Sequence, residues 1–273
     1  MLSSVTCKNC GSKLQENYCA KCGEKRFDKN QLSFKHFVEE TFEGLVHFDN
    51  KLFRTIKTLF AKPGQLSLDY VEGRRTMYMK PIQFFLVINL LFFVLVRSNP
   101  YSIDLYNYVH YTPFTNFNTV KIVQDKIAAL GVDYVTYSYL FNERMKSESK
   151  EFIFVFIPLY GIISWLLFVR YKRLIVEHLV FATHFVAFTL CFFFLQTYLI
   201  TIPFYFIQNS ENVDMISGII SCVILGWYFA IASRRFYKAH IIWSIVTALI
   251  IGVCVVGFIQ VYRMVLFYKI IYL

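Results

Sequence analysis

The chain has 273 residues, of which 56% are hydrophobic and 19% aromatic. This apolar content exceeds the roughly one half that is usual for soluble domains, which argues against an ordinary globular protein and favours a membrane protein. The formal net charge is +10, and the Lys and Arg residues gather in the first eighty residues and in two short later segments, RYKR and SRRFYK.

Two C-x-x-C-G motifs stand near the amino terminus, at residues 7–11 and 19–23. A C-x-x-C turn brings two sulfur atoms close enough to share one ion, and the glycine after it allows a positive φ angle. Two such turns fill all four positions of a tetrahedral site, so we predict a structural metal site and not a catalytic one. The predicted ligands are Cys7, Cys10, Cys19 and Cys22.

We expect this metal to be zinc, although iron fits the same geometry and stays open. A thioredoxin-like redox motif would need a surrounding βαβ domain, which so short a segment does not supply. The first 30 residues also lack the apolar stretch of a secretory signal, so we expect the amino terminus in the cytosol, where disulfides are rare. Metal binding would itself drive the folding of this module.

Two amphipathic helices are predicted between the cysteines and the first apolar span. The first begins near Ser33, an N-cap residue, and the second carries an apolar side from Leu52 to Phe60 and ends at Pro63 and Gly64. Basic amphipathic helices of this kind lie among anionic lipid headgroups. Nucleic acid would also attract these charges, but cations on the cytosolic side of a membrane protein are expected anyway, so we favour the lipid interpretation.

The segment YVEGRRTMYMKP, residues 70–81, is the densest polar stretch beside a span. Its two arginines can each bind a phosphate group through two parallel hydrogen bonds, and a lipid headgroup is the simplest such ligand. Our candidate residues for binding a lipid or another phosphorylated ligand are Arg74, Arg75, Lys80, His47 and Asp49.

Five apolar stretches predict transmembrane helices. They cover about residues 81–96, 151–169, 179–207, 213–232 and 241–262, the last with an apolar tail to residue 273. Pro81 suits a first helical turn, and Pro203 is the expected bend in the third span. His184, in the same span, is interpreted as a hydrogen-bonded core histidine.

Most basic residues then fall on one side, so the positive-inside rule predicts a cytosolic amino terminus and an external carboxyl terminus. Residues 97–150 would form an extracytoplasmic loop, within which TVKIVQDKIAAL has the apolar spacing of a small helix. We expect this loop to lie on the outer membrane surface as a lid, in preference to a ligand-binding ectodomain.

The predicted protein is therefore an all-α integral membrane protein. A zinc-ribbon-like module (residues 1–30) and amphipathic juxtamembrane helices (31–80) precede a membrane domain of about five spans (81–273).

The residues before the first span carry a resemblance. The chain resembles an uncharacterised bacterial family of small multi-pass membrane proteins, a domain of unknown function with a C-x-x-C-G pair followed by H-x-D, T-x-x-x-L, P-G and Y-x-x-G-[KR]-R motifs. The resemblance covers about residues 7–96, implies the bacterial inner membrane and supplies no activity. The matching positions after the cysteines are His47, Asp49, Thr55, Leu59, Pro63, Gly64, Tyr70, Gly73, Arg74, Arg75, Tyr78 and Pro81.

The function we expect is that of a membrane scaffold or sensor whose zinc module binds a cytosolic protein. The alternative is a small permease or a protein that handles a lipid or phosphate ligand through Arg74 and Arg75. The spans hold few ionisable groups, which argues against ion-coupled transport and against an enzyme.

Overall fold

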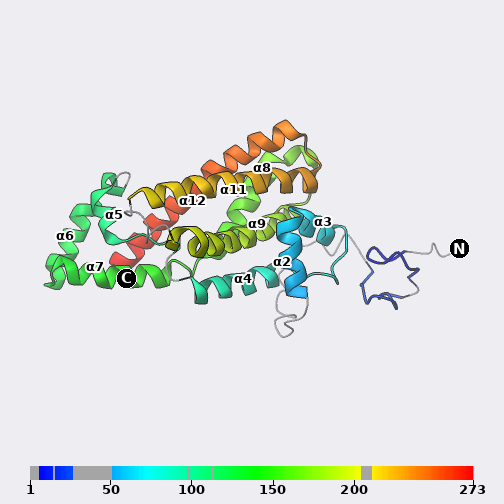
Figure 1. The fold of residues 1–273 in the computed structure, drawn as a ribbon, viewed down its shortest axis with the longest axis horizontal. Helices are drawn as coiled ribbons and strands as arrows, with labels where there is room; N and C mark the ends of the chain where they lie inside the picture. Colours follow the sequence, from blue (N-terminus) through cyan, green and yellow to red (C-terminus); the bar gives the residue numbers. More distant parts are fainter. Residues whose placement is uncertain are drawn as a thin grey trace. The chain divides into compact units, whose positions relative to one another are not determined.

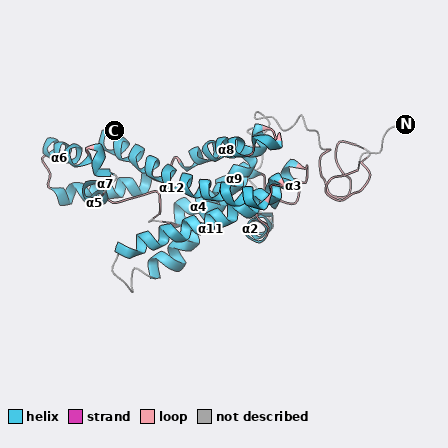
Figure 2. Ribbon diagram, turned by 90° about the horizontal axis from the view of Figure 1, so that it is seen from above, coloured by secondary structure: helices cyan, strands magenta, loops and turns pink. Residues whose placement is uncertain are grey.

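The computed structural model describes residues 6–14, 16–26, 51–96, 99–111, 114–203 and 211–272, and for residues 211–215 it describes the backbone alone. Helices dominate this part of the chain (Figures 1 and 2). Extended pairing within it is limited to two isolated antiparallel bridges, Thr6 with Lys13 and Tyr18 with Lys25. The predicted all-α fold is confirmed.

The helices are labelled in Figure 1. In chain order, the α-helices are α2 (Lys51–Ala61), α3 (Gln65–Val71), α4 (Pro81–Leu95), α5 (Leu105–His110), α6 (Thr119–Leu130), α7 (Tyr134–Glu148), α8 (Phe156–Leu167), α9 (Ile175–Gln196), α11 (Glu211–Tyr237) and α12 (Ile241–Tyr272). Short 3₁₀ turns occupy Phe114–Phe117, Ile153–Val155 and Val169–Tyr171, and a π-helical turn occupies Thr197–Thr201.

Four helical segments are long and apolar enough to cross a membrane. They are Ile153–Tyr171, Ile175–Thr201, Ile216–Tyr237 and Ile241–Tyr272, and they coincide with four of the predicted spans. The remaining predicted span is α4, which starts at Pro81 as expected and has only 15 residues. At 1.5 Å per residue it is about 22 Å long, which is shorter than a hydrocarbon core of about 30 Å.

The third predicted span changes its helical pitch just before Pro203. Helix α9 passes at Thr197 into the π-helical turn that ends at Thr201. Proline has no backbone N–H to donate to the preceding turn, so the regular hydrogen-bond ladder is interrupted there. This irregularity lies at the position where the sequence predicted a bend.

The chain divides into two compact units. The first comprises residues 1–92, 155–192 and 223–251, and the second comprises residues 93–154, 193–222 and 252–273. In the first unit α9 is the central helix, since every residue from Val180 to Leu190 is buried. Aromatic stacking joins α9 to α11, where the ring centroids of Phe188 and Tyr228 are 3.5 Å apart and the two planes are nearly parallel.

Within this unit, the backbone at the end of α2 and in the α2–α3 turn is hydrogen-bonded to side chains of α11. The Tyr228 hydroxyl donates to the Leu59 carbonyl at 3.1 Å, and the Arg235 guanidinium donates to the Pro63 carbonyl at 2.7 Å. Between them Gly64 has φ +79°, and a Cβ atom there would collide with the carbonyl of Ala232. Glycine is therefore required twice at this turn, for its backbone angle and for the close approach to α11.

Two buried histidines tie the first unit together. His184 Nδ1 lies 2.9 Å from the Ser67 hydroxyl of α3, which confirms the interpretation of His184 as a hydrogen-bonded core residue. His178 Nδ1 lies 2.8 Å from the Tyr237 hydroxyl at the end of α11. Buried polar groups need such partners, so these two bonds fix the rotation of α9 against its neighbours.

The second unit contains the segment predicted as an extracytoplasmic loop, and this segment is folded. The predicted small helix is α6, accompanied by α5 and α7. Their core is aromatic, since Tyr108 and Phe141 are buried and their rings lie 4.7 Å and 5.9 Å from Phe267 of α12. The Tyr108 hydroxyl also donates to the Arg263 carbonyl at 2.8 Å.

Several cations of the second unit are held by this fold. Arg263 donates to the Pro100 carbonyl at 2.7 Å, and Lys269 forms ion pairs with Glu148 and Glu151 at 2.9 Å and 3.2 Å. Both cations of α12 therefore have polar partners within the second unit, a carbonyl for Arg263 and two carboxylates for Lys269.

Candidate metal centre

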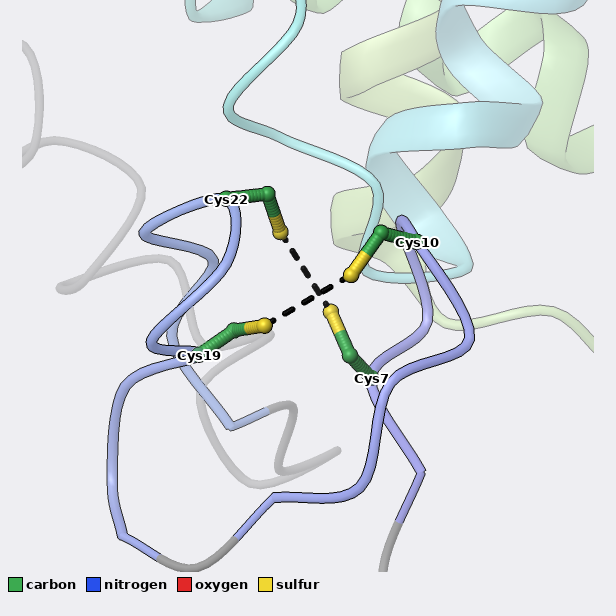
Figure 3. Close-up of side chains that lie close together, drawn as sticks. All are labelled: Cys7, Cys10, Cys19 and Cys22. Atoms are coloured by element: carbon green, nitrogen blue, oxygen red, sulfur yellow. Dashed lines mark hydrogen bonds between the residues drawn. The ribbon is translucent and has the colours of Figure 1, made fainter.

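Two short loops bring four sulfur atoms together. The Sγ atoms of Cys7, Cys10, Cys19 and Cys22 all lie within 4.8 Å of one another, and in Figure 3 they point toward a common centre. The Cys7–Cys22 and Cys10–Cys19 separations are 3.6 Å and 3.5 Å. Sulfurs bound tetrahedrally to zinc at about 2.3 Å are spaced by about 3.8 Å. The cluster therefore has the donors and the spacing for one metal ion, as the sequence predicted.

The two loops are nearly identical in their backbone bonding. In the first, the amide of Cys7 donates to the Ser12 carbonyl at 2.8 Å and the amide of Gly11 donates to the Cys7 carbonyl at 2.9 Å. The second repeats both bonds at the same offsets, from Cys19 to Glu24 and from Gly23 to Cys19, each at 2.8 Å. Both glycines have the predicted positive φ, +72° and +71°.

Cys10 and Cys22 differ in how readily their thiols ionise. Hydrogen bonding with the side chain and then with the backbone of Ser12 lowers the pKa of Cys10 to about 6. The backbone N–H of Glu24 acts in the same direction on Cys22, but burial and the hydrogen bonds shared with Cys10 and Cys7 outweigh it and raise the pKa of Cys22 to about 11. A metal ion bound by all four sulfurs must therefore displace protons at neutral pH.

The second loop is attached to the segment after α3 through a buried carboxylate. Glu24 is only 4% exposed, and its Oε2 atom accepts hydrogen bonds from the backbone amides of Arg75 and Thr76, each at 3.0 Å. The Thr76 hydroxyl donates to the same oxygen at 2.9 Å. One carboxylate oxygen thus accepts three hydrogen bonds, which compensates for its burial.

The first loop contacts the same threonine. The Asn9 side-chain amide donates to the Thr76 hydroxyl oxygen at 3.0 Å. Thr76 is therefore held by one residue of each cysteine loop. A metal ion bound by all four sulfurs would fix the two loops against each other, and with them the two groups that hold Thr76.

Arg74, a candidate for phosphate binding, faces carboxylates of its own chain. Its Nε atom donates to Asp69 at 2.8 Å and its Nη2 atom donates to Glu72 at 2.7 Å. Partial burial lowers the pKa of Arg74, but Asp69 and Glu72 outweigh it and hold that pKa above its usual range. A phosphate group would have to compete with two carboxylates for this guanidinium.

The other candidate residues are placed differently. The Arg75 guanidinium lies over the Tyr70 ring, 4.4 Å from its centroid, and its Nε atom donates to the Tyr70 carbonyl at 3.2 Å. Lys80 is half-buried directly before α4, where its carbonyl accepts a bond from Phe84. His47 and Asp49 lie outside the described residues.

Reasoning from the sequence missed Glu24, Asn9, Thr76 and Asp69. One signal for Glu24 was present, because the two loops match at each cysteine and glycine but carry Ser12 in one and Glu24 in the other. This difference marks Glu24 as the position where the loops diverge, but a charged residue is usually exposed, so the sequence alone did not predict its buried contact. No comparable signal marks Thr76.

No curated protein and no solved structure matches the chain. Residues 49–93, which include α2, α3 and the Tyr70–Arg75 motif but none of the four cysteines, match a family model described as "Protein of unknown function (DUF3667)".

Proposed function

We propose that the chain is a membrane-embedded scaffold or sensor in which a structural zinc module faces the cytosol and binds a protein partner. The observation that carries this proposal is the attachment of both cysteine loops to Thr76, because it connects the metal cluster directly to the segment that enters α4. Loading or loss of the metal would then be transmitted to the membrane domain through four hydrogen bonds to the Arg75–Thr76 segment, three accepted by Glu24 and one donated by Asn9.

Zinc is the metal we propose. The four thiols leave no open coordination position, which suits a structural ion without redox chemistry. Iron bound by four thiolates would need the same spacing, so elemental analysis of the purified protein decides between the two metals. We expect about one zinc per chain.

For the location, we propose the bacterial inner membrane with the amino terminus in the cytosol and the carboxyl terminus outside. Two basic clusters carry the supporting charges. Arg170, Lys172 and Arg173 precede α9, and Arg234 and Arg235 lie in the last turn of α11 with Lys238 directly after it. Basic residues beside spans favour the cytosolic side. The cations of α12 that oppose this orientation, Arg263 and Lys269, are bound to groups of their own unit and weigh less against it.

The experiment is a co-purification of protein partners in detergent, comparing wild type with Cys7→Ser. Cys254→Ser is the matched control, because Cys254 is a free, half-buried cysteine of α12 outside the cluster. We expect Cys7→Ser to lose both the metal and the specific partner, and Cys254→Ser to keep both. Retention of every partner after loss of the metal would remove the proposed binding role.

The alternative function, handling of a phosphorylated ligand by Arg74 and Arg75, is addressed by a separate measurement. Native mass spectrometry of the double variant Arg74→Ala and Arg75→Ala would show loss of a retained anionic lipid if these residues bind it. The ion pairs of Arg74 with Asp69 and Glu72 favour the scaffold over this alternative.

A further inference from the structure

A shallow, open hollow lies where α11 ends, in the first unit. Its volume is about 480 Å³, and it is lined by Ile231, Arg234, Arg235, Lys238 and Ala239. Three of these five residues are cations. Within the part of the chain that the structure describes, none of the three forms an ion pair with a carboxylate.

The hollow is at the level of a membrane surface. The segment Ile216–Tyr237 is long and apolar enough to cross a membrane, and the next such segment begins at Ile241. Lys238 and Ala239 therefore belong to a turn of three residues between two spans. Lys238 in this turn and Arg234 and Arg235 in the last turn of α11 would thus lie at the level of the lipid headgroups.

Arg235 is held in position for this role. One of its nitrogens donates to the Pro63 carbonyl in the α2–α3 turn at 2.7 Å. A guanidinium has five N–H donors, so the bond to Pro63 orients the group and leaves others for a ligand. Arg234 and Lys238 are exposed beside it, and like charges gathered in one hollow repel one another unless an anion lies between them.

The helix surface below the hollow is apolar and exposed. Val223, Trp227, Ile231 and Arg234 follow one another at intervals of four, four and three residues, which places them on one face of α11. Val223 and Trp227 are 65% and 64% exposed. One end of a ligand in the hollow would thus contact the cations. Its other end would lie along the apolar face of α11, toward the membrane interior.

We infer that the hollow formed by Arg234, Arg235 and Lys238 binds the phosphate group of an anionic phospholipid, whose acyl chains lie along Trp227 and Val223. Arginine suits this ligand because its planar fork bonds two phosphate oxygens at once. The apolar face distinguishes a lipid from a free phosphate ion, which would gain nothing from Trp227. The inference does not depend on the metal centre or on the proposed partner.

The test uses the full chain in a non-ionic detergent, incubated with phosphatidylglycerol or phosphatidylcholine and measured by native mass spectrometry. The variant is Arg234→Gln with Lys238→Gln. The control is Arg170→Gln with Lys172→Gln, which removes two exposed cations from the turn before α9 and leaves the hollow unchanged. Each of the two replaced cations would lose a charge-assisted hydrogen bond to the phosphate, so we expect at least about 10-fold weaker retention of phosphatidylglycerol in the variant and a much smaller change in the control.

Three results would overturn the inference. Equal loss of lipid in the variant and the control would mean a general effect of charge, and unchanged retention in both would mean that the hollow binds no lipid. Displacement of phosphatidylglycerol by millimolar inorganic phosphate would assign the site to a soluble phosphate.

A further variant, Arg234→Lys, keeps the positive charge that determines membrane orientation. We expect it to retain less phosphatidylglycerol than wild type and more than the double variant, because lysine cannot form two parallel hydrogen bonds to a phosphate group.

Discussion

Glu24 and Thr76 are joined by two hydrogen bonds to a single carboxylate oxygen, although 52 residues separate them in the chain. Glu24 directly follows the second cysteine loop, and Thr76 directly follows the two arginines before α4. The contact therefore links the cysteine cluster to the segment that precedes the first apolar helix, α4. A metal ion bound by the four cysteines would therefore help to order the Arg75–Thr76 segment.

The first prediction concerns this carboxylate. Glu24→Ala would leave the amides of Arg75 and Thr76 without their acceptor, and we expect a loss of about 1–3 kcal/mol in the free energy of unfolding. Hydrogen exchange of residues 74–77 measures the effect locally and should accelerate. The control is Glu16→Ala, because Glu16 is exposed on the same module. Equal protection of residues 74–77 in Glu24→Ala and wild type would contradict the contact.

A second prediction follows from competition between protons and the metal. The metal-bound cluster needs four thiolates, whereas the metal-free cluster holds protons at neutral pH, since the pKa of Cys22 is raised to about 11. The metal-bound form thus carries fewer protons, so its stability rises with pH and falls as pH decreases. We expect metal retention against a fixed chelator to decrease steadily from pH 8 to pH 5. Elemental analysis after dialysis at each pH measures it, and a flat profile would exclude thiolate ligands.

The sequence predicted the cysteine cluster and the spans because both depend on local patterns. Motif spacing places the sulfurs of Cys7 and Cys10 together, and apolar length identifies a helix such as α12. The sequence could not tell which face of α2 is buried. Its pattern grouped Phe53 with Leu59, yet Phe53 is 76% exposed and Leu59 is 1% exposed. Thr55, a polar residue, is buried instead, because its hydroxyl accepts a bond from the Met79 amide, a contact that only the folded chain defines.

A third prediction tests the folded segment of the second unit. Tyr108→Phe removes the hydroxyl of a buried tyrosine that donates to the Arg263 carbonyl. We expect a loss of about 1 kcal/mol in the free energy of unfolding. Tyr106→Phe is the control, because the Tyr106 side chain is 51% exposed. Thermal unfolding in detergent compares the two variants, and an equal effect of both would mean that α5 does not pack on α12.

The last prediction separates two roles of glycine in the α2–α3 turn. Gly64 and Gly131 both have positive φ angles, +79° and +64°, so replacement by alanine strains the backbone at either position by about 1 kcal/mol. At Gly131 a Cβ atom would meet nothing within 4 Å, whereas at Gly64 it would collide with the backbone of Ala232. Gly64→Ala must therefore also push α11 away, which adds about 1–3 kcal/mol as in other overpacked cores. We expect the thermal midpoint to fall further for Gly64→Ala than for Gly131→Ala. If the two variants unfold at the same temperature, the α2–α3 turn does not lie against α11. That result would also contradict the hydrogen bond between Arg235 and the Pro63 carbonyl, which requires the same packing.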